Sequence, residues 1–391
     1  MQKLVPRFAL LRFGLISATV AWGQMASQAP HPFAPGSCGP VDPTYIRVAE
    51  QTGGIPFFFQ RSEVAQSTKL MLFGSGQNLV TLLWAKGQAT GNEFVVPVDS
   101  SLEQVTFEFS ATSHDSKMEV FGPNEVRMTE VSSAETTDFT CGRFLVLKQP
   151  TPGSYRIHIA SAGPYWVSVA GKSNIFLTRV EFVEPGGRPG HEGMFPIHGQ
   201  PLVGKTANFE ASVTGNVRAI SFALVTPEHQ LIRSLNLRAS QSQDDEYDFE
   251  GQFSLPSEPF RVMATGIDQN GMSFERMLGR LFRPTTISLV LTSEGDVAAG
   301  VSSALIFEAK NLGKPDSFAL RAVCGSRWAA ELDRAVVSLG HGETAKVVVT
   351  VSVPEGTPAY SSSDLVLTAS SESDSSITNG VVHHLLIQSR K

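Results

Sequence analysis

Charged residues, cysteines and long apolar runs are all scarce in this 391-residue chain. Charged residues make up 17% of it, the formal net charge is −6 and no basic stripe is present, which argues against nucleic acid as a partner. After the first 23 residues, no apolar run is long enough to span a bilayer. Hydrophobic residues reach 41%, so the chain has enough apolar material for about two to four domains.

The sequence also lacks the short motifs of common enzyme and metal sites. It has no Gly-x-Ser-x-Gly elbow, and the fragment FGSGQN has neither the lysine nor the following helix of a phosphate loop. His191, Glu192 and His198 form the only local group of metal-binding residue types. Because they lie in a Gly/Pro-rich stretch and not on a helix, we expect them to form hydrogen bonds at a hinge. We predict no catalytic residue, metal or cofactor.

The stretch PFRVMATGIDQNGMSFERM, residues 259–277, poses a choice between a calcium loop and a hairpin. An EF-hand loop needs its glycine at the sixth position, whereas Gly271 follows Asp268 by only three residues. Asn-Gly between two alternating runs is the strongest short signal for a β-hairpin, in which both central residues have positive φ. We therefore predict a hairpin turn at Asn270 and Gly271.

The three cysteines are Cys38, Cys141 and Cys324, so an oxidising compartment would leave one of them unpaired. Sequence alone allows three pairings. Cys38 and Cys141 lie in the turn-like settings GSCGP and FTCGR, each followed by glycine, whereas Cys324 lies in an alternating, strand-like run. We predict a Cys38–Cys141 disulfide and a buried thiol at Cys324.

The first 23 residues have the features of a secretory signal peptide. The basic residues Lys3, Arg7 and Arg12 precede the apolar stretch FGLISATVAW, and Ala21 and Gly23 supply small residues for a cleavage site. We expect cleavage near Gly23, with Ala26 as the alternative, and a secreted protein of the periplasm or the extracellular space. A buried first helix is the other interpretation.

Periodicity divides the rest of the chain into five parts. Residues 24–42 are a Pro/Gly-rich linker, and residues 43–77 predict a helix, the short buried strand IPFFF and a second helix. From Asn78 onward, short alternating segments separated by turn residues indicate antiparallel sandwiches. The expected class is all-β, with three consecutive immunoglobulin-like sandwich modules. Their predicted bounds are 78–184, 185–285 and 286–391.

Aromatic residues on strands are candidates for stacking a carbohydrate ligand. Trp84, Trp166 and Trp328 each fall on a predicted strand. Tyr165 precedes Trp166, so one of these two side chains faces inward and the other outward. The alternative is that the tryptophans belong to the core.

Residues 43–284 resemble part of the hemicentins and related extracellular proteins, in which a von Willebrand factor A domain precedes β-modules. The segment YIRVAEQTGGIPFFFQRSEVAQSTKLM is similar to the end of such an A domain. The runs NEFVVPVDSSLEQVTFEFSA and PFRVMATGIDQNGMSFERM are similar to the modules that follow it. The last module resembles the immunoglobulin-like domains of many secreted bacterial proteins.

This sequence departs from the resemblance at the metal-binding part of the A domain. That part requires Asp-x-Ser-x-Ser, and DSSLE at 99–103 and DSSIT at 374–378 both fail at the last position. Metal-dependent adhesion is therefore not implied. The resemblance implies an extracellular setting and β-modules that bind or act as spacers, and a chain carrying a complete A domain is one candidate partner.

The sequence predicts a non-enzymatic, adhesion-like interaction or scaffold protein. Its partner would be another protein or a surface polysaccharide, bound through sheet edges and loop tips. The alternative is a carbohydrate-binding accessory protein, which requires exposed aromatic residues on one sheet face. A third interpretation is a hydrolase with an unfamiliar site, which requires histidine and carboxylate side chains that converge at a module junction.

Overall fold

The computed structural model describes residues 38, 42–68, 78–88, 91–187, 190–243, 245–326 and 328–387. The predicted signal peptide with its cleavage near Gly23, most of the 24–42 linker and residues 69–77 lie outside this part of the chain. The chain divides into two compact units. Unit 1 comprises residues up to Val180 with Glu210–Gly251 and Phe260–Leu281, and unit 2 comprises Glu181–Phe209, Gln252–Pro259 and residues from Phe282 onward.

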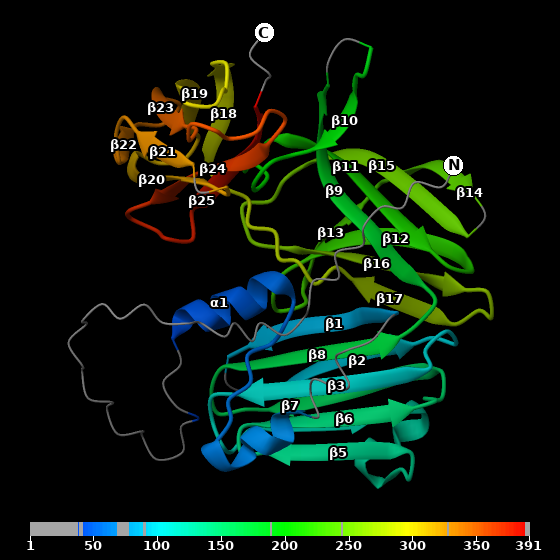
Figure 1. The fold of residues 1–391 in the computed structure, drawn as a ribbon. Coiled ribbons are helices and arrows are strands. Elements are labelled where there is room, and N and C mark those ends of the chain that lie inside the picture. The colour runs from blue at the N-terminus through cyan, green and yellow to red at the C-terminus, as the bar shows by residue number, and fades with distance from the viewer. Residues whose placement is uncertain are drawn as a thin grey trace. The chain divides into compact units, whose positions relative to one another are not determined.

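Most of the described structure is β-strand, as the alternating sequence predicts (Figure 1). The first strands are β1 Leu79–Gly87, β2 Asn92–Val98, β3 Gln104–Ala111, β4 Lys117–Phe121, β5 Ala134–Phe139, β6 Gly142–Lys148, β7 Gly153–Ala160 and β8 Tyr165–Lys172. The next are β9 Phe176–Gly186, β10 Gly193–Pro196, β11 Thr206–Thr214, β12 Val217–Val225, β13 Leu231–Leu235, β14 Arg238–Gln243, β15 Glu246–Ser254, β16 Arg261–Asp268 and β17 Ser273–Met277. The last are β18 Ile287–Glu294, β19 Ser302–Asn311, β20 Asp316–Cys324, β21 Ala329–Leu332, β22 Val336–Leu339, β23 Thr344–Ser352, β24 Ser362–Ser371 and β25 Thr378–Leu386.

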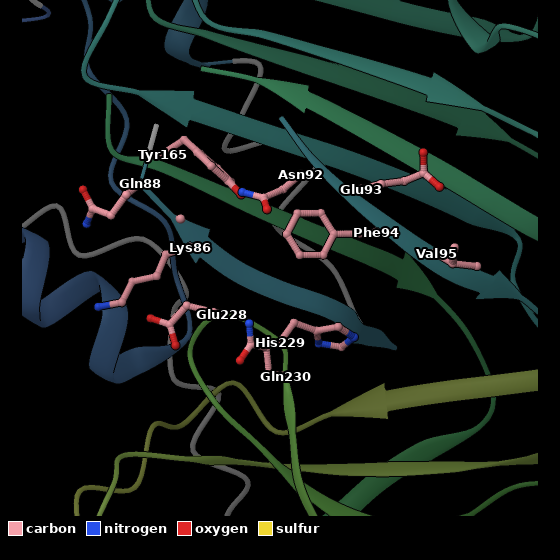
Figure 2. Close-up of a pocket in the computed structure, with 11 residues that line it drawn as sticks. Lys86, Gln88, Asn92, Glu93, Phe94, Val95, Tyr165, Glu228, His229 and Gln230 are labelled. Atoms are coloured by element: carbon pink, nitrogen blue, oxygen red, sulfur yellow. The ribbon is translucent and has the colours of Figure 1, made fainter. Parts of the chain in front are cut away.

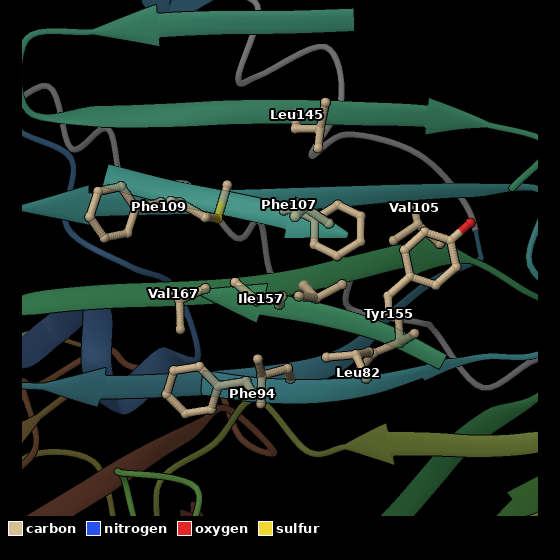
Figure 3. Packing of buried hydrophobic residues seen from close by; sticks show 14 of the residues in the cluster. Leu82, Phe94, Val105, Phe107, Phe109, Leu145, Tyr155, Ile157 and Val167 are labelled. Atoms are coloured by element: carbon tan, nitrogen blue, oxygen red, sulfur yellow. The ribbon is translucent and has the colours of Figure 1, made fainter. Parts of the chain in front are cut away.

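Unit 1 is built on a nine-stranded sheet with the order β13-β12-β16-β17-β1-β8-β3-β6-β5. The three-stranded sheet β2-β7-β4 packs on the β1-β8-β3-β6 part of it. Figure 3 shows the apolar side chains that meet between the two layers, such as Phe94 and Ile157 from the small sheet and Phe107 and Val167 from the large one. The small sheet alternates in burial, whereas β1 and β8 are buried along nearly their whole length.

The other face of β1 and β8 is covered by the segment before β1. Helix α1, Pro43–Thr52, begins at Asp42, whose side chain accepts a hydrogen bond from the Thr44 amide. It ends at Gly53, which has a φ of 84° and so the left-handed conformation that glycine tolerates best. The short 3-10 turn η1, Arg61–Glu63, and helical residues 64–68 follow.

The segment IPFFF is buried but is not a strand, which corrects the sequence prediction. Its phenylalanine rings lie on the side chains of the sheet face, and its backbone pairs with no strand. Phe58 contacts Trp166, with ring centres 5.7 Å apart, and Phe59 contacts Phe139 at 5.0 Å. The apolar residues of this segment therefore pack within the chain.

A disulfide joins Cys38 to Cys141, the pairing that the sequence favours. It ties the chain before α1 to the residue that precedes β6, over a separation of 103 residues. In the chain-entropy model, a closed loop of this length stabilises the fold by about 4–5 kcal/mol. Cys324 is a buried free thiol, as expected.

Residues 185–285, the predicted second module, are divided between the two units. Strands β12, β13, β16 and β17 continue the nine-stranded sheet of unit 1, because β17 pairs with β1 through Thr81 and Met277. Residues 181–209 and 252–259 belong to unit 2 instead. A free β1 edge would expose unpaired backbone groups, and β17 covers it.

The predicted hairpin connects β16 to β17, but its turn differs from the predicted type. Gly271 has a φ of 85°, whereas Asn270 is not among the described residues with positive φ. The Gly271 amide donates to the Asp268 carbonyl at 3.1 Å, and the Asp268 amide donates to the Met272 carbonyl at 2.8 Å. The loop is therefore longer than a two-residue turn, and only its glycine needs the left-handed conformation.

Unit 2 contains an immunoglobulin-like sandwich of two four-stranded sheets. Their orders are β18-β19-β23-β21 and β22-β20-β24-β25. The buried Asn311 side chain donates to the carbonyls of Lys314 and Leu339 at 2.7 and 3.0 Å. A further sheet has the order β10-β9-β11-β15-β14. None of the helices in the described residues has the length and apolarity to cross a membrane.

The packing of Phe58 predicts a large effect of its truncation. Phe58→Ala should lower the free energy of unfolding by about 3 kcal/mol or more, because it removes a buried ring and leaves a cavity. Tyr45→Ala, on an exposed position of α1, is the control and should change it by about 0.5 kcal/mol or less. Urea unfolding measures both. Equal effects would mean that the segment is not part of the core.

Candidate functional site

A pocket of about 420 Å³ opens in unit 1 and is called here the polar pocket (Figure 2). Its walls come from the ends of β1, β2 and β8 and from the turn between β12 and β13. The lining residues are Lys86, Gly87, Gln88, Asn92, Glu93, Phe94, Val95, Tyr165, Glu228, His229 and Gln230. The pocket thus joins strands of the first predicted module to a turn of the second.

One wall is fixed by a buried tyrosine. Tyr165 begins β8 and is 1% exposed, and its hydroxyl accepts a hydrogen bond from the Asn92 side chain at 2.5 Å. Burial raises the pKa of this hydroxyl, although the hydrogen bond from Asn92 acts in the opposite direction. A side chain at Gly87 would collide with the Tyr165 ring and hydroxyl, so only glycine fits there.

The opposite wall is the turn at residues 226–230, which presents His229. The His229 amide donates to the Thr226 carbonyl at 2.9 Å, and the Thr226 hydroxyl accepts from the Gln230 amide at 3.2 Å. The Lys86 amide of β1 donates to the Pro227 carbonyl at 2.9 Å, which attaches the turn to the sheet. His229 has a φ of 63°, an uncommon conformation for a non-glycine residue that these bonds maintain.

The imidazole of His229 lies between Phe94 and Glu275. Its ring packs edge-on against Phe94, with centres 6.3 Å apart, and its Nε2 lies 3.5 Å from Oε1 of Glu275. Burial lowers the pKa of His229 to about 4. Burial also raises the pKa of Glu275 to about 8, although the charge of Arg276 lowers it. Near pH 7 the imidazole is therefore neutral and the carboxyl is protonated.

Two charged residues of the lining are already paired. Nζ of Lys86 lies 3.2 Å from Oε2 of Glu50, and Oε1 of Glu50 accepts a hydrogen bond from the Trp166 indole at 3.0 Å. Glu93 pairs with Arg156 at 3.3 Å. The third charged lining residue, Glu228, is exposed. The lining therefore offers this carboxylate, several neutral hydrogen-bonding groups and an aromatic ring to a ligand. No serine, threonine or cysteine is among the eleven lining residues of the described chain.

The tryptophans predicted to stack a ligand are buried instead. Trp84 is 0% exposed, and Trp166 and Trp328 are each 5% exposed. The Trp84 indole donates to the Gly54 carbonyl at 3.0 Å, and the guanidinium carbon of Arg261 lies 3.9 Å from the centre of its ring. Trp84 and Trp166 hold α1 and the segment after it on the sheet, and Trp328 is part of the core of unit 2. None of the three presents its ring to solvent.

His191, Glu192 and His198, the local group of metal-binding residue types in the sequence, do not form one site in the structure. His191 and Glu192 are exposed, and Glu192 accepts a hydrogen bond from the Gly190 amide at 3.1 Å. His198 lines a separate pocket of about 420 Å³ within unit 2. The pair His229 and Glu275 was missed by sequence reasoning, because the two residues are 46 positions apart and neither stands in a recognisable motif.

The two shifted groups affect stability with opposite signs. Glu275 has a higher pKa in the folded state than in the unfolded state. Its contribution to the free energy of unfolding is therefore full below about pH 4.5 and is lost as the pH rises towards 8. His229 has a lower pKa when folded, so its contribution is present above pH 6.5 and is lost as the pH falls towards 4. Between pH 6.5 and 8, only the Glu275 effect operates.

We expect the free energy of unfolding to fall by about 1 kcal/mol per pH unit between pH 6.5 and 8. Glu275→Gln should remove most of this slope, because the amide does not titrate. Glu246→Gln, at an exposed position of β15, should keep it. Urea unfolding at several pH values measures the slope. A slope unchanged in Glu275→Gln would contradict the assignment.

Two family models match the chain. Residues 79–174 match the hemicentin galactose-binding domain-like family, and residues 287–389 match the Ig-like domain family of VWA7. The first match covers β1 to β8, which supply most of the polar pocket. The second covers the immunoglobulin-like sandwich of unit 2. Galactose-binding-like and Ig-like modules point to an extracellular interaction protein.

Solved structures show only distant likeness. The titin fragment I67–I69 with an E-to-A mutation is 10% identical, with 77% of this chain and 94% of that chain covered and a TM-score of 0.19. The mouse nectin-like molecule 4 ectodomain is 12% identical, with 77% and 95% covered and a TM-score of 0.19. Bacillus licheniformis lipase BlEst2 in its propeptide form is 10% identical, with 56% and 47% covered and a TM-score of 0.24.

The chain thus spans about half of the lipase. TM-scores of this size carry no argument about catalysis. No curated protein matches the chain.

Proposed function

Because the chain is built from hemicentin-like and von Willebrand A-associated β-modules, we propose that it is a secreted, non-catalytic interaction protein. Its galactose-binding-like module would bind a saccharide unit of a surface polysaccharide in the polar pocket. The observation that carries this proposal is the preformed pocket of about 420 Å³ in which Asn92 and Tyr165 lie in the same lining as Phe94 and the turn at 228–230. Secretion would follow from the first 23 residues, with cleavage near Gly23.

The chemistry of the lining fits a polar ligand. A saccharide presents hydroxyl donors and acceptors together with an apolar ring face, and binding sites usually combine a few fixed polar groups with aromatic side chains. Asn92 and Gln230 supply the hydrogen-bonding groups, and Phe94 supplies the aromatic ring. Because all three candidate tryptophans are buried, the ligand would be held by this pocket and not on a flat aromatic surface.

The same geometry argues against hydrolysis. A histidine beside a carboxyl group is one part of a nucleophilic site, but such a site also needs a hydroxyl or thiol within hydrogen-bond reach of the histidine. The described lining residues include tyrosine but no serine, threonine or cysteine. The Glu275 carboxyl is protonated near pH 7, so it would not orient an imidazolium ion as a catalytic carboxylate does.

The hydroxyl of Tyr165 provides the sharpest test. Tyr165→Phe should weaken saccharide binding by about tenfold, because Asn92 loses the group that orients it. Tyr155→Phe is the matched control: Tyr155 is also buried and donates a hydrogen bond, to the Thr151 carbonyl at 3.1 Å, but it does not line the pocket.

The measurement is a glycan array on the intact protein, followed by titration calorimetry with the best ligand. Both variants should lose similar stability, so a difference between them in affinity reports on the pocket. Equal affinities of the two variants, or no glycan bound by the wild type, would contradict the proposal.

A protein partner is the second candidate, and strand β10 favours it. β10 is at the edge of its sheet and pairs with β9 on one side. Its residues Met194 and Phe195 are 43% and 45% exposed. An exposed edge with apolar side chains accepts an added strand from another chain, and this partner could be a chain with a complete A domain.

Phe195→Lys should abolish such strand addition, because a charged edge residue discourages pairing. Val290→Lys, at an exposed position of β18, is the control and should leave it intact. Retention of partners from the native extracellular fraction, read by mass spectrometry, measures the effect. Partners retained equally by both variants would exclude β10 as the docking edge.

A further inference from the structure

Glu228 brings a carboxylate without a partner to the lining of the polar pocket. The other two charged lining residues, Lys86 and Glu93, are held in ion pairs. The Glu228 carboxylate forms no ion pair or hydrogen bond with any residue that the structure describes. It is exposed on the turn at residues 226–230 (Figure 2). A ligand in the pocket can therefore bind this carboxylate without breaking an existing ion pair.

Hydrogen bonds fix the backbone that carries this carboxylate. The Glu228 amide donates to the Thr226 hydroxyl at 3.2 Å, and the Thr226 amide donates to the Gln230 carbonyl at 2.8 Å. The Lys86 amide donates to the Pro227 carbonyl at 2.9 Å and so attaches the same turn to β1. Because the turn is already ordered, a ligand that contacts it does not bear the cost of ordering a loop.

Carboxylates outnumber cations around the polar pocket. Arg156, the partner of Glu93, also pairs with Glu125, so one guanidinium serves two carboxylates. Lys86 is balanced by its own carboxylate partner, and Glu228 adds a further negative charge. A site with an excess of negative charge attracts a cationic ligand and repels an anionic one.

An ammonium group suits this lining better than a metal ion does. Ca²⁺ takes about six to eight oxygen ligands, whereas the unpaired acceptors of the lining are one carboxylate and the amide oxygens of a few side chains, such as Gln230. A protonated primary amine has three N–H donors, which a carboxylate and one or two amide oxygens can satisfy. The lining therefore indicates a ligand with a primary ammonium group.

We propose that the saccharide unit selected by the polar pocket is an amino sugar with a free amine, whose ammonium group binds Glu228. This inference rests on the saccharide binding proposed above and names the class of sugar. N-acetylation removes the positive charge, so an N-acetylated sugar gains nothing from Glu228. A uronic acid or a sulfated sugar brings a second negative charge beside Glu228 and binds more weakly than the neutral sugar.

A matched series of small glycosides tests the selectivity on the intact protein. The probes are the methyl glycosides of galactose and of glucose, each with its 2-amino, 2-acetamido and uronic acid analogues, titrated by NMR at about pH 6.5. We expect the 2-amino glycoside of at least one series to bind about threefold tighter than its neutral parent. This advantage should shrink as the salt concentration rises from about 0.02 M to about 0.5 M, because salt screens exposed charges.

Two glutamate variants assign the advantage to one carboxylate. Glu228→Gln should remove the preference for the amine and leave the affinity for the neutral parent within about twofold. Glu246→Gln removes the same charge from an exposed position outside the lining, and it should keep the preference. Both substitutions are at exposed positions, so both variants should fold like the wild type, which circular dichroism checks.

The outcomes separate this proposal from the proposed function. If the neutral and 2-amino glycosides bind the wild type equally, or if the two variants keep the same preference, the selection of an amine is overturned while saccharide binding stands. If no glycoside of either series binds, the amino-sugar proposal is overturned as well, and the glycan array decides separately whether the pocket binds another saccharide.

Discussion

The buried pair of Arg276 and Asp99 fixes how the two parts of unit 1 join. Their side chains are 1% and 0% exposed, and Nη1 of Arg276 lies 2.8 Å from Oδ2 of Asp99. The same guanidinium donates to the Ile175 carbonyl at 2.8 Å and to the hydroxyls of Ser101 and Ser173 at 3.1 and 2.7 Å. A buried ion pair is weak evidence for stability, because removing two charges from water is costly. Its effect here is to attach β17 to the residues that follow β2 and β8 in one register.

This attachment matters because the ladder between β1 and β17 is short. The described pairing consists of Thr81 opposite Met277. Beside it, Asp268 accepts hydrogen bonds at 3.0 and 2.5 Å from the amide and hydroxyl of Ser100. The residues DSS at 99–101, which fail as a metal motif, thus hold the β16–β17 hairpin. Through the pairing of β16 with β12, they also set the position of the turn that carries His229.

Periodicity in the sequence was enough to predict the all-β class, because alternation reports which side chains face a core; it did not single out short strands such as β5 and β10. The settings of the cysteines likewise favoured the pair that is bonded. Alternation failed for Trp84 and Trp166, since both faces of β1 and β8 are covered and an outward side chain is still buried. It failed for IPFFF because a short apolar run does not reveal whether a strand edge is available.

The candidate site could not be predicted because it is made by pairing between distant segments. Residues 86–88, residues 92–95, Tyr165 and the turn at 228–230 meet in a fold in which β17 pairs with β1, and nothing local in the sequence specifies that contact. His229 and Glu275 have ordinary neighbours in the chain, and their shifted pKa values arise from burial. The grouping of residues 185–285 was missed for the same reason: edge pairing joins strands that turn signals alone would assign to separate modules.

The most direct measurement of the central claim is a crystal structure of the whole protein with its best-binding glycan. The structure described here predicts electron density for one sugar ring between Tyr165 and the turn at 228–230. That ring should receive or donate hydrogen bonds at Asn92 and Gln230 while its apolar face meets Phe94. A glycan bound only elsewhere, with the polar pocket filled by water, would contradict the assignment of this pocket as the ligand site.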